Sequence, residues 1–510
     1  MAITRRELLL KGSAGLAMAA AIRGRAQTSS GHKPNLLFLI ADDHARYVLR
    51  CEGNAQAVTP NLDRLASEGV RFGRHYCNAP VCTPSRQSIL TGQLPHSAGV
   101  TVLSTPLAED KPTLARQLDA AGYATAVFGK MHFNRPGHPG LHGFQTCITE
   151  DLTGKLWKST GGSRLVPDDI RTKPPWRPFH DPARIWLNAD KLPFPRYYEN
   201  MQSTWDVEQA KSFLRQHVDT PFALWVSLQQ PHSPFDFPVE DRADFAPSSF
   251  AVPRIGSEDP EQIPLIFRGL SPEDKQGIIA SYYTSVRYLD HNMGVVLAEL
   301  RRLNLDRDTL VVYMADHGYS LGQHGRFEKH CCYEPAIVAP LIMRWPGRIQ
   351  PRVVHDFTES VDVPPTILEM LGAEPFRVQH GQSLKPYLEG GRIAVPRQSI
   401  FSEYLENEEA CVRTARWKFI QCSGKRARRD GYITFNPLPG RYTRLYDVVA
   451  DPGEFTDRSA QHPEVIAELS GVMLQRFRTT HPDAASEPSN LSVPDAIDWY
   501  LRPRDTQPSA

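Results

Sequence analysis

Short apolar runs alternate with amphipathic segments along most of the chain. Apolar runs with the length and residue types of buried strands occupy residues 35–44, 123–130, 222–232 and 309–320. Apolar positions with helical spacing occupy residues 59–72, 111–122 and 273–303. Strands that alternate with helices in this way predict an α/β fold: a doubly wound, mainly parallel sheet flanked by helices on both faces.

The pattern changes after about residue 385. The stretches SIFSEYL, ACVRTARWKFIQC and TRLYDVVADPGEFTD have the composition of short strands without intervening long helices. They predict a smaller C-terminal unit built on an antiparallel sheet. We therefore expect a catalytic α/β domain at 34–385 and a C-terminal α+β subdomain at 386–510. Cys411 and Cys422 have a spacing at which two thiols can face each other across a hairpin.

Polar side chains follow the predicted strands at the point where each strand ends. In open α/β sheets, ligands bind outside the carboxyl ends of the strands. Repeated placement of charged residues at this one edge therefore predicts a functional site there. The residues concerned are Asp42, Asp43, Lys130, His132, His232, Asp316 and His317.

Three of these side chains are carboxylates that the fold brings toward one point. Asp42, Asp43 and Asp316 would repel one another strongly in a partly dry cleft, and a divalent cation relieves that repulsion. Hard oxygen ligands favour calcium or magnesium. His317 next to Asp316 shifts the preference toward manganese or zinc, since these metals accept imidazole. The pattern predicts a divalent-metal site.

The segment CTPSRQSILTG combines a cysteine with the start of a helix. Thr83 suits the N-cap, Pro84 the first helical position, and Gly92 the position after the last turn. Cys82 is then at the positive end of a short helix, where the thiol pKa falls and anions bind. Arg86 lies one turn further on. Taken alone, the cysteine could equally be a buried structural residue.

This segment resembles the signature C-x-P-S-R-x-x-x-L-T-G of the type I sulfatases, in the alkaline phosphatase superfamily, at every fixed position. The resemblance continues in the same order through ADD, GKMH, QPH and ADHG to Lys329 and LYDVVADPGE, and covers most of the chain. It implies that Cys82 is oxidised after translation to formylglycine, by a formylglycine-generating enzyme. Hydration of that aldehyde gives two hydroxyls on one carbon, one to attack sulfur and one to release sulfate.

The resemblance also implies a set of metal ligands. Asp42, Asp43, Asp316 and His317 match the family's metal-ligand positions, and the modified Cys82 completes the set. Calcium is the expected ion, with manganese as the alternative. Many family members carry Asn where this chain has His317, and the His variant occurs among relatives that cleave phosphonate or phosphate esters. The metal and the ester preference are therefore both open at this point.

Five further roles follow from the resemblance. Arg86 would hold the geminal diol, and Lys130 would bind sulfate oxygens. His132 would accept a proton as sulfate is released. His232 and Lys329 would lie across the sulfate, as general acid and clamp for the leaving oxygen. Cations in these positions stabilise negative charge that spreads over the sulfate oxygens in the transition state.

The leading hypothesis is hydrolysis of a sulfate monoester, with a sulfated glycan as the preferred substrate class. A phosphonate or phosphate ester hydrolase with the same aldehyde is the first alternative. A catalytically inactive protein that binds sulfate or glycan is the remote one, because no matched catalytic position is missing.

Residues 1–26 have a basic pair, Arg5-Arg6, a weakly apolar run and a small-residue cleavage site, which is typical of a signal peptide. The form TRRELL resembles the twin-arginine type and predicts export to the periplasm. A short amphipathic helix is the alternative. No later run reaches the ~20 apolar residues of a membrane span.

Removing this segment takes five basic and one acidic residue from 58 and 57 and leaves a net charge of −3. That balance excludes a nucleic-acid partner on grounds of charge. Eight cysteines in 510 residues do not form the dense pattern of a disulfide framework. The sequence does not indicate the oligomeric state or the identity of the natural substrate.

Overall fold

The computed structural model describes residues 33–159, 166, 187–257, 259–424 and 441–505. The predicted signal segment 1–26 lies outside the described residues, as do 160–165 and 167–186. Every element below belongs to one compact unit that starts at Pro34. Among the described residues, no helix is both long enough and apolar enough to cross a membrane.

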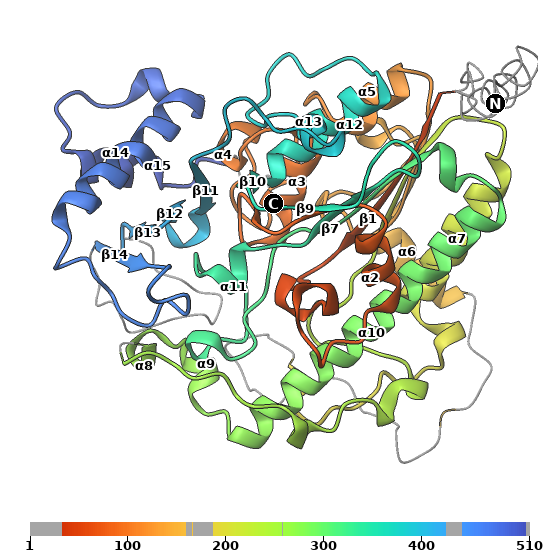
Figure 1. Ribbon diagram of the computed structural model, residues 1–510, viewed down its shortest axis with the longest axis horizontal. Coiled ribbons are helices and arrows are strands. Elements are labelled where there is room, and N and C mark those ends of the chain that lie inside the picture. Colours follow the sequence, from red (N-terminus) through yellow and green to blue (C-terminus); the bar gives the residue numbers. More distant parts are fainter. Residues whose placement is uncertain (1–32, 160–165, 167–186, 258, 425–440, 506–510) are drawn as a thin grey trace, which may run out of the picture. The chain divides into compact units, whose positions relative to one another are not determined.

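The main sheet has eight strands in the order β5-β4-β6-β1-β7-β8-β2-β9 (Figure 1). The first five run parallel, β8 is antiparallel to β7, and β2 is antiparallel to β8. This arrangement confirms the predicted mainly parallel sheet. The strands are β1 (Asn35–Ala41), β2 (Val70–Phe72), β4 (Ala124–Gly129), β5 (Thr146–Thr149), β6 (Phe222–Ser227), β7 (Thr309–Ala315), β8 (Leu341–Arg344) and β9 (Arg352–Val354).

Helices cover both faces of this sheet, as a doubly wound fold requires. Alternate residues of β1 show why: Leu36, Phe38 and Ile40 belong to one apolar cluster, while the residues between them belong to another. The first cluster includes side chains from α3 (Cys82–Thr91), α5 (Leu114–Ala120) and α12 (Val363–Leu371). The second includes side chains from α2 (Pro60–Ser67), α7 (Gln202–Gln216) and α10 (Pro272–Arg302).

The remaining elements are short or lie outside the main layers. The helices are α4 (Pro95–Ala98), α6 (Glu150–Ser159), α8 (Asp259–Gln262), α9 (Leu265–Arg268), α11 (Glu334–Ile337), α13 (Lys385–Leu388), α14 (Pro463–Thr480) and α15 (Val493–Tyr500). A second small sheet pairs β3 (His75–Tyr76) with β10 (Thr358–Glu359) in parallel. The predicted helix at 59–72 is shorter than expected, because residues 70–72 pair with β8 and β9 as β2.

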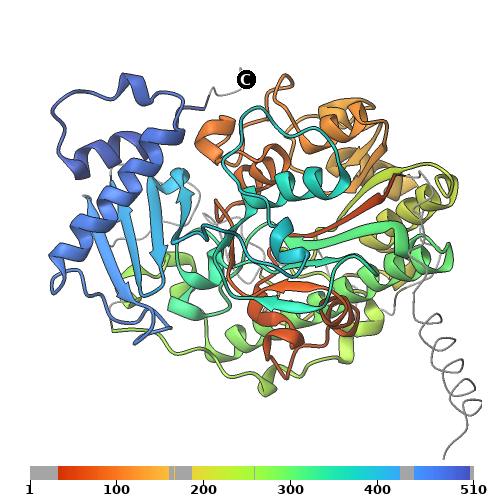
Figure 2. The ribbon, with the colours of Figure 1, turned by 45° about the horizontal axis from the view of Figure 1, so that its top comes forward.

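The C-terminal part contains the predicted antiparallel sheet, which α14 and α15 cover (Figure 2). Its strands are β11 (Ser399–Tyr404), β12 (Glu409–Thr414), β13 (Trp417–Cys422) and β14 (Tyr442–Asp447), in that order. The register pairs Cys411 with Ile420 and Cys422 with Glu409, so the two cysteines do not face each other. All eight cysteines are among the described residues, and all are free thiols.

A buried histidine in β3 makes stability depend on pH. The His75 side chain is fully buried with Thr358 within 3.1 Å of Nδ1. Burial, and secondarily Arg397, lowers the pKa of His75 to about 3. Between pH 6.5 and 3 the unfolded chain binds a proton here that the folded chain does not, so folded stability decreases as pH falls through this window.

We expect His75→Asn to flatten the pH dependence of the unfolding free energy. The difference in slope between wild type and variant should reach up to about 1.4 kcal/mol per pH unit in this window. Urea unfolding at a series of pH values measures both slopes. Equal slopes would show that His75 already accepts its proton in the folded state.

Candidate active site

The strand order brings the predicted site residues together. Strands β4, β6, β1 and β7 are parallel neighbours, so their carboxyl ends meet at one edge of the sheet. The chain that follows each strand contributes polar side chains to this edge. They are Lys130 and His132 after β4, His232 after β6, Asp42 and Asp43 after β1, and Asp316 and His317 after β7.

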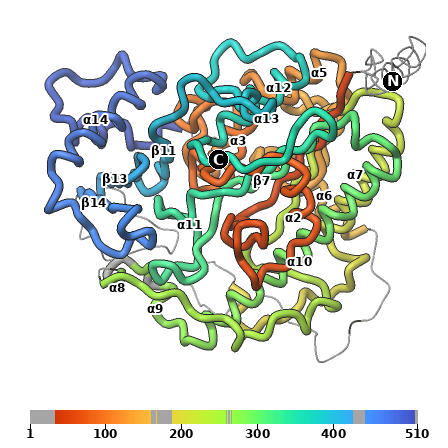
Figure 3. The backbone as a smooth tube through the Cα atoms, viewed as in Figure 1, coloured from red at the N-terminus to blue at the C-terminus, as the bar shows by residue number. Residues whose placement is uncertain are grey.

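Cys82 is the first residue of α3, and its side chain is buried. The helix lies against the ends of β1 and β7, although these segments are far apart in the sequence (Figure 3). The Cys82 Sγ atom is 3.3 Å from Asp42 Oδ1, 3.4 Å from His317 Nε2 and 3.2 Å from Lys329 Nζ. Cys82 therefore occupies the centre of the cluster.

The start of α3 differs from the prediction by two residues. Val81 is the N-cap and makes no side-chain cap, whereas Thr83 lies inside the helix. The Thr83 hydroxyl instead donates to the carbonyl of Leu103 at 2.7 Å. Gly92 ends the helix with φ 68°, as predicted. The helix therefore begins with the cysteine itself.

Arg86 is buried and tied to two of the carboxylates. Its Nε donates to Asp316 Oδ2 at 2.8 Å, and its Nη2 is 3.5 Å from Asp42 Oδ1. Its Nη1 donates to the carbonyl of Lys130 at 2.6 Å and to Ser227 Oγ at 2.8 Å. Burial opposes the guanidinium charge, but Asp316 and Asp42 keep the pKa of Arg86 above its ordinary value. Arg86 thus joins four strand ends, those of β1, β4, β6 and β7.

The donor set fits a divalent cation. Ligand atoms of Asp42, Cys82, Asp316 and His317 all lie within 4.8 Å of one another, and an overlapping group includes Asp43 and His232. Asp43 Oδ2 is buried and has no hydrogen-bond partner among the described residues. His317 Nδ1 is 2.9 Å from the Gly318 carbonyl, which leaves Nε2 toward the cluster. An orphaned carboxylate oxygen and an oriented imidazole are what a metal site requires.

The pKa values of two groups in the cluster also indicate that it favours positive charge. Burial raises the pKa of Asp316 to about 7, against the opposing effects of His317 and Arg86. Burial disfavours charge on His317, yet Asp316 and Cys82 raise its pKa to about 9. The Asp316 carboxyl thus retains a cation near it, whether a proton or a metal ion.

Two lysines also approach Cys82. Lys130 pairs with Asp42, and Lys329 Nζ donates to Asp43 Oδ1 at 2.6 Å. Burial raises the pKa of the Cys82 thiol, but Lys130, Lys329 and His317 outweigh it and hold the pKa well below its usual value. The site therefore stabilises negative charge at residue 82.

The two remaining histidines are half-buried at the edge of the cluster. Burial and Lys130 lower the pKa of His132, and the nearby Cys82 opposes this shift. His232 Nδ1 is 2.7 Å from the Ser233 carbonyl, and His232 belongs to the group around Asp43. The structure therefore gathers all ten predicted site residues in one place, while their individual roles stay predictions.

Among the residues that support this arrangement, sequence reasoning missed Ser227 and Gln87. Ser227, the last residue of β6, accepts from Arg86 and donates to the Lys130 carbonyl. Gln87 donates its side-chain amide to the carbonyls of Met131 and His132, at 3.2 and 3.0 Å. Gln87 occupies a variable position of the signature, so only its contacts reveal it.

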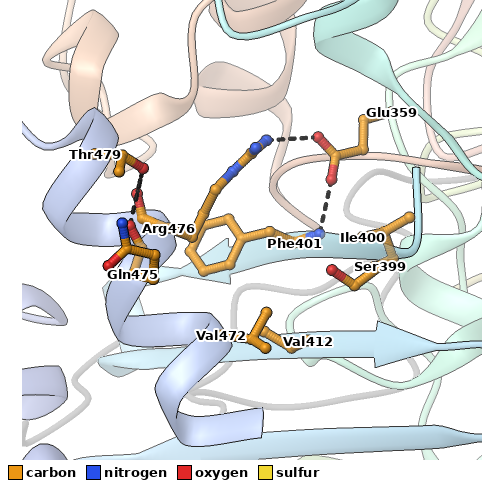
Figure 4. Close-up of a pocket in the computed structure, with 9 residues that line it drawn as sticks. All are labelled: Glu359, Ser399, Ile400, Phe401, Val412, Val472, Gln475, Arg476 and Thr479. Carbon is orange, nitrogen blue, oxygen red and sulfur yellow. Dashed lines mark hydrogen bonds and ion pairs between the residues drawn. The ribbon is translucent and has the colours of Figure 1, made fainter. Parts of the chain in front are cut away.

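A cavity of about 210 Å³ lies elsewhere, between α14 and strands β11 and β12 (Figure 4). Phe401, Val412 and Val472 supply its apolar lining. Arg476 at its edge donates to Glu359 at 2.9 Å, so the two charges neutralise each other. None of the ten site residues lines this cavity.

A family model for the sulfatases matches residues 34–373, which include all ten site residues. The chain belongs to the sulfatase family. A second model, the C-terminal part of N-sulphoglucosamine sulphohydrolase, matches residues 322–479.

Curated relatives agree with this assignment. A choline-sulfatase of Rhizobium meliloti is 25% identical, covering 92% of this chain and 91% of that protein. Human arylsulfatase A is 29% identical, covering 92% of this chain and 90% of that protein. The enzyme is a sulfuric ester hydrolase.

Solved structures share the fold. The phosphonate monoester hydrolase of Silicibacter pomeroyi aligns with a TM-score of 0.72 at 25% identity, over 90% of this chain and 98% of that one. A protein solved with D-glucosamine-2-N,6-O-disulfate aligns with a TM-score of 0.66 at 22% identity, over 88% of this chain and 98% of that one. These likenesses support the alkaline-phosphatase-like architecture.

Proposed function

We propose that the enzyme hydrolyses a sulfate monoester with a formylglycine formed at Cys82 and a divalent cation held by Asp42, Asp43, Asp316 and His317. One observation carries the proposal: Cys82 begins α3 at the point where carboxylates and lysines from the chain after β1, β4 and β7 meet. Hydrated formylglycine would supply one hydroxyl that displaces the alcohol from sulfur and a second that, on losing its proton, releases sulfate and restores the aldehyde. A bound cation would lower the pKa of the first hydroxyl.

The other side chains have separate proposed roles around the sulfate. Lys130 and Lys329 bring two ammonium groups near Cys82 Sγ, at 3.9 and 3.2 Å, and can neutralise charge on the sulfate oxygens. His232 and Lys329 assist the leaving oxygen, and His132 accepts a proton from residue 82. Arg86 keeps Asp42 and Asp316 in place through its two ion pairs.

A phosphonate or phosphate ester hydrolase is the second candidate. His317, where many sulfatases have Asn, and the fold likeness to a phosphonate monoester hydrolase favour it. Turnover of matched aryl sulfate and aryl phosphonate esters, with calcium, magnesium and manganese in turn, separates the two. We expect the sulfate ester to be turned over faster with every metal. Faster turnover of the phosphonate with every metal would instead favour a phosphonate or phosphate ester hydrolase.

For the substrate class we propose sulfated glycans, and for the location the periplasm, through a twin-arginine signal in residues 1–26. Relatives that act on glycans support the first point, among them an N-acetylglucosamine-6-O-sulfatase of Bacteroides thetaiotaomicron that is 28% identical. A desulfation screen over sulfated sugars, choline sulfate and aryl sulfates tests the class. Cell fractionation with and without Arg5-Arg6 tests the route. A formylglycine-generating enzyme is the implied partner.

His317→Asn should move the metal preference toward calcium. Asn offers an amide oxygen where His offers a nitrogen, and oxygen ligands favour calcium over manganese. Metal content after chelation and reconstitution with equal calcium and manganese measures the shift directly. His355→Asn, at an exposed position, is the matched control. An unchanged metal profile would count against His317 as a ligand.

A further inference from the structure

The turn that presents Lys130 and His132 has an unusual backbone. Gly129, at the end of β4, has φ 99°, and a side chain there would meet the Ser227 carbonyl at 2.0 Å. His132 has φ 53°, a left-handed conformation that is unfavourable for any residue with a Cβ atom. Such a conformation persists only when the surrounding structure holds it.

Hydrogen bonds hold this turn from both sides. Its carbonyls accept from α3: Arg86 donates to Lys130, and Gln87 donates to Met131 and His132. Its first amide, that of Lys130, donates to the Ser227 carbonyl at 2.7 Å. The amides of the next two residues, Met131 and His132, share a single acceptor.

That acceptor is one carboxylate oxygen. Glu150 Oε1 accepts from the amide of Met131 at 2.7 Å and also from the amide of His132. The topology explains the contact: β5 is the parallel neighbour of β4 and pairs Thr149 with Gly129. Glu150 therefore follows β5 at the same level of the sheet at which Lys130 follows β4.

We infer that Glu150 is a positioning residue of the active site, which fixes the left-handed turn and thereby aims Lys130 and His132 at the sulfate. The inference rests on the proposed function for the roles of those two side chains. The contact itself is independent of that function. Because one carboxylate oxygen accepts from both amides, removal of Glu150 leaves both donors without that partner at once, which is costly for buried groups.

A simpler role for Glu150 has different consequences. Glu150 is also the first residue of α6, where a negative charge stabilises a helix through its dipole. In that case its removal would lower stability without altering the turn after β4. Thr153, buried in the same helix and hydrogen-bonded to Ile148 O at 3.2 Å, offers a matched control for this effect.

Hydrogen exchange tests the inference without relying on turnover. In a Cys82→Ala background, Glu150→Ala should raise exchange of the Met131 and His132 amides at least about tenfold. Glu150→Gln keeps an acceptor oxygen and should restore protection. Thr153→Ala should lower the melting temperature and leave both amides protected. Equal protection in Glu150→Ala and wild type, or loss of protection in Thr153→Ala, would overturn the inference.

Kinetics with Cys82 intact give the second readout. Glu150→Ala should lower kcat by about 100-fold and raise KM for the sulfate ester, as expected for misplaced catalytic groups. Glu150→Gln should stay within about threefold of wild type. If Glu150→Ala does not fold, Glu150→Asp, one methylene shorter, replaces it in both measurements, with smaller effects in the same direction. An inactive wild type with a protected turn would count against the proposed function and leave Glu150 as the anchor of the turn.

Discussion

Cys82→Ala is expected to lose at least about 10⁴-fold in turnover of a sulfate ester, because alanine has no thiol for conversion to formylglycine and the nucleophile cannot form. The fold should survive. The start of α3 depends on the backbone at Val81, and its end depends on Gly92, neither of which the substitution alters. The side chain removed contacts charged groups of the site and contributes no large apolar area. Circular dichroism and a melting curve check the fold, and an aryl sulfate assay checks the turnover.

Cys147→Ala is the matched control for this variant. Cys147 is also a buried free thiol, but it lies in β5 and belongs to the apolar cluster under one face of the sheet. Its loss should lower stability and leave turnover near that of wild type. Activity that persists in Cys82→Ala, or an equal loss in both variants, would remove residue 82 from the mechanism.

Lys329→Ala is expected to lower kcat/KM by about 10²–10³-fold, the usual cost of removing a preorganised cation from a transition state. Lys329 is 6% exposed and touches both Cys82 Sγ and Asp43. Because its proposed role is at the leaving oxygen, the loss should grow as the alcohol becomes a poorer leaving group. A series of aryl sulfates with phenols of increasing pKa measures this dependence.

Lys211→Ala provides the comparison. Lys211 pairs with Glu208 on the surface of α7, and such exposed pairs contribute little. Its replacement should alter neither kcat/KM nor the dependence on the phenol. A Lys329→Ala loss that is the same for every phenol would place the lysine on the bound sulfate and not on the leaving group.

Much of the site could be predicted because its residues follow strands that are easily recognised. The residues of β1 and β7 form continuous buried runs, and each run ends in an aspartate. The mainly parallel sheet then implies that these ends share one edge. The order β4-β6-β1-β7, which makes them neighbours, is set by side-chain packing over long sequence distances and leaves no local signal.

The errors have a common cause: a distant partner competes with a local preference. Thr83 has the side chain of a cap, but the Leu103 carbonyl takes its hydroxyl. Residues 70–72 continue a helical pattern, yet β8 and β9 recruit them into the sheet. The short turn between β12 and β13 decides the register that separates Cys411 from Cys422. Glu150 gave no signal at all, since its partners are backbone amides.

The chemical state of residue 82 tests the central claim most directly. Cleavage after Arg74 and Arg86 releases a peptide, 75–86, that contains Cys77 and Cys82. After alkylation of active enzyme, made together with a formylglycine-generating enzyme, mass spectrometry should find one labelled cysteine, Cys77, and an aldehyde at position 82. A fully active preparation in which both cysteines carry the label would contradict the account.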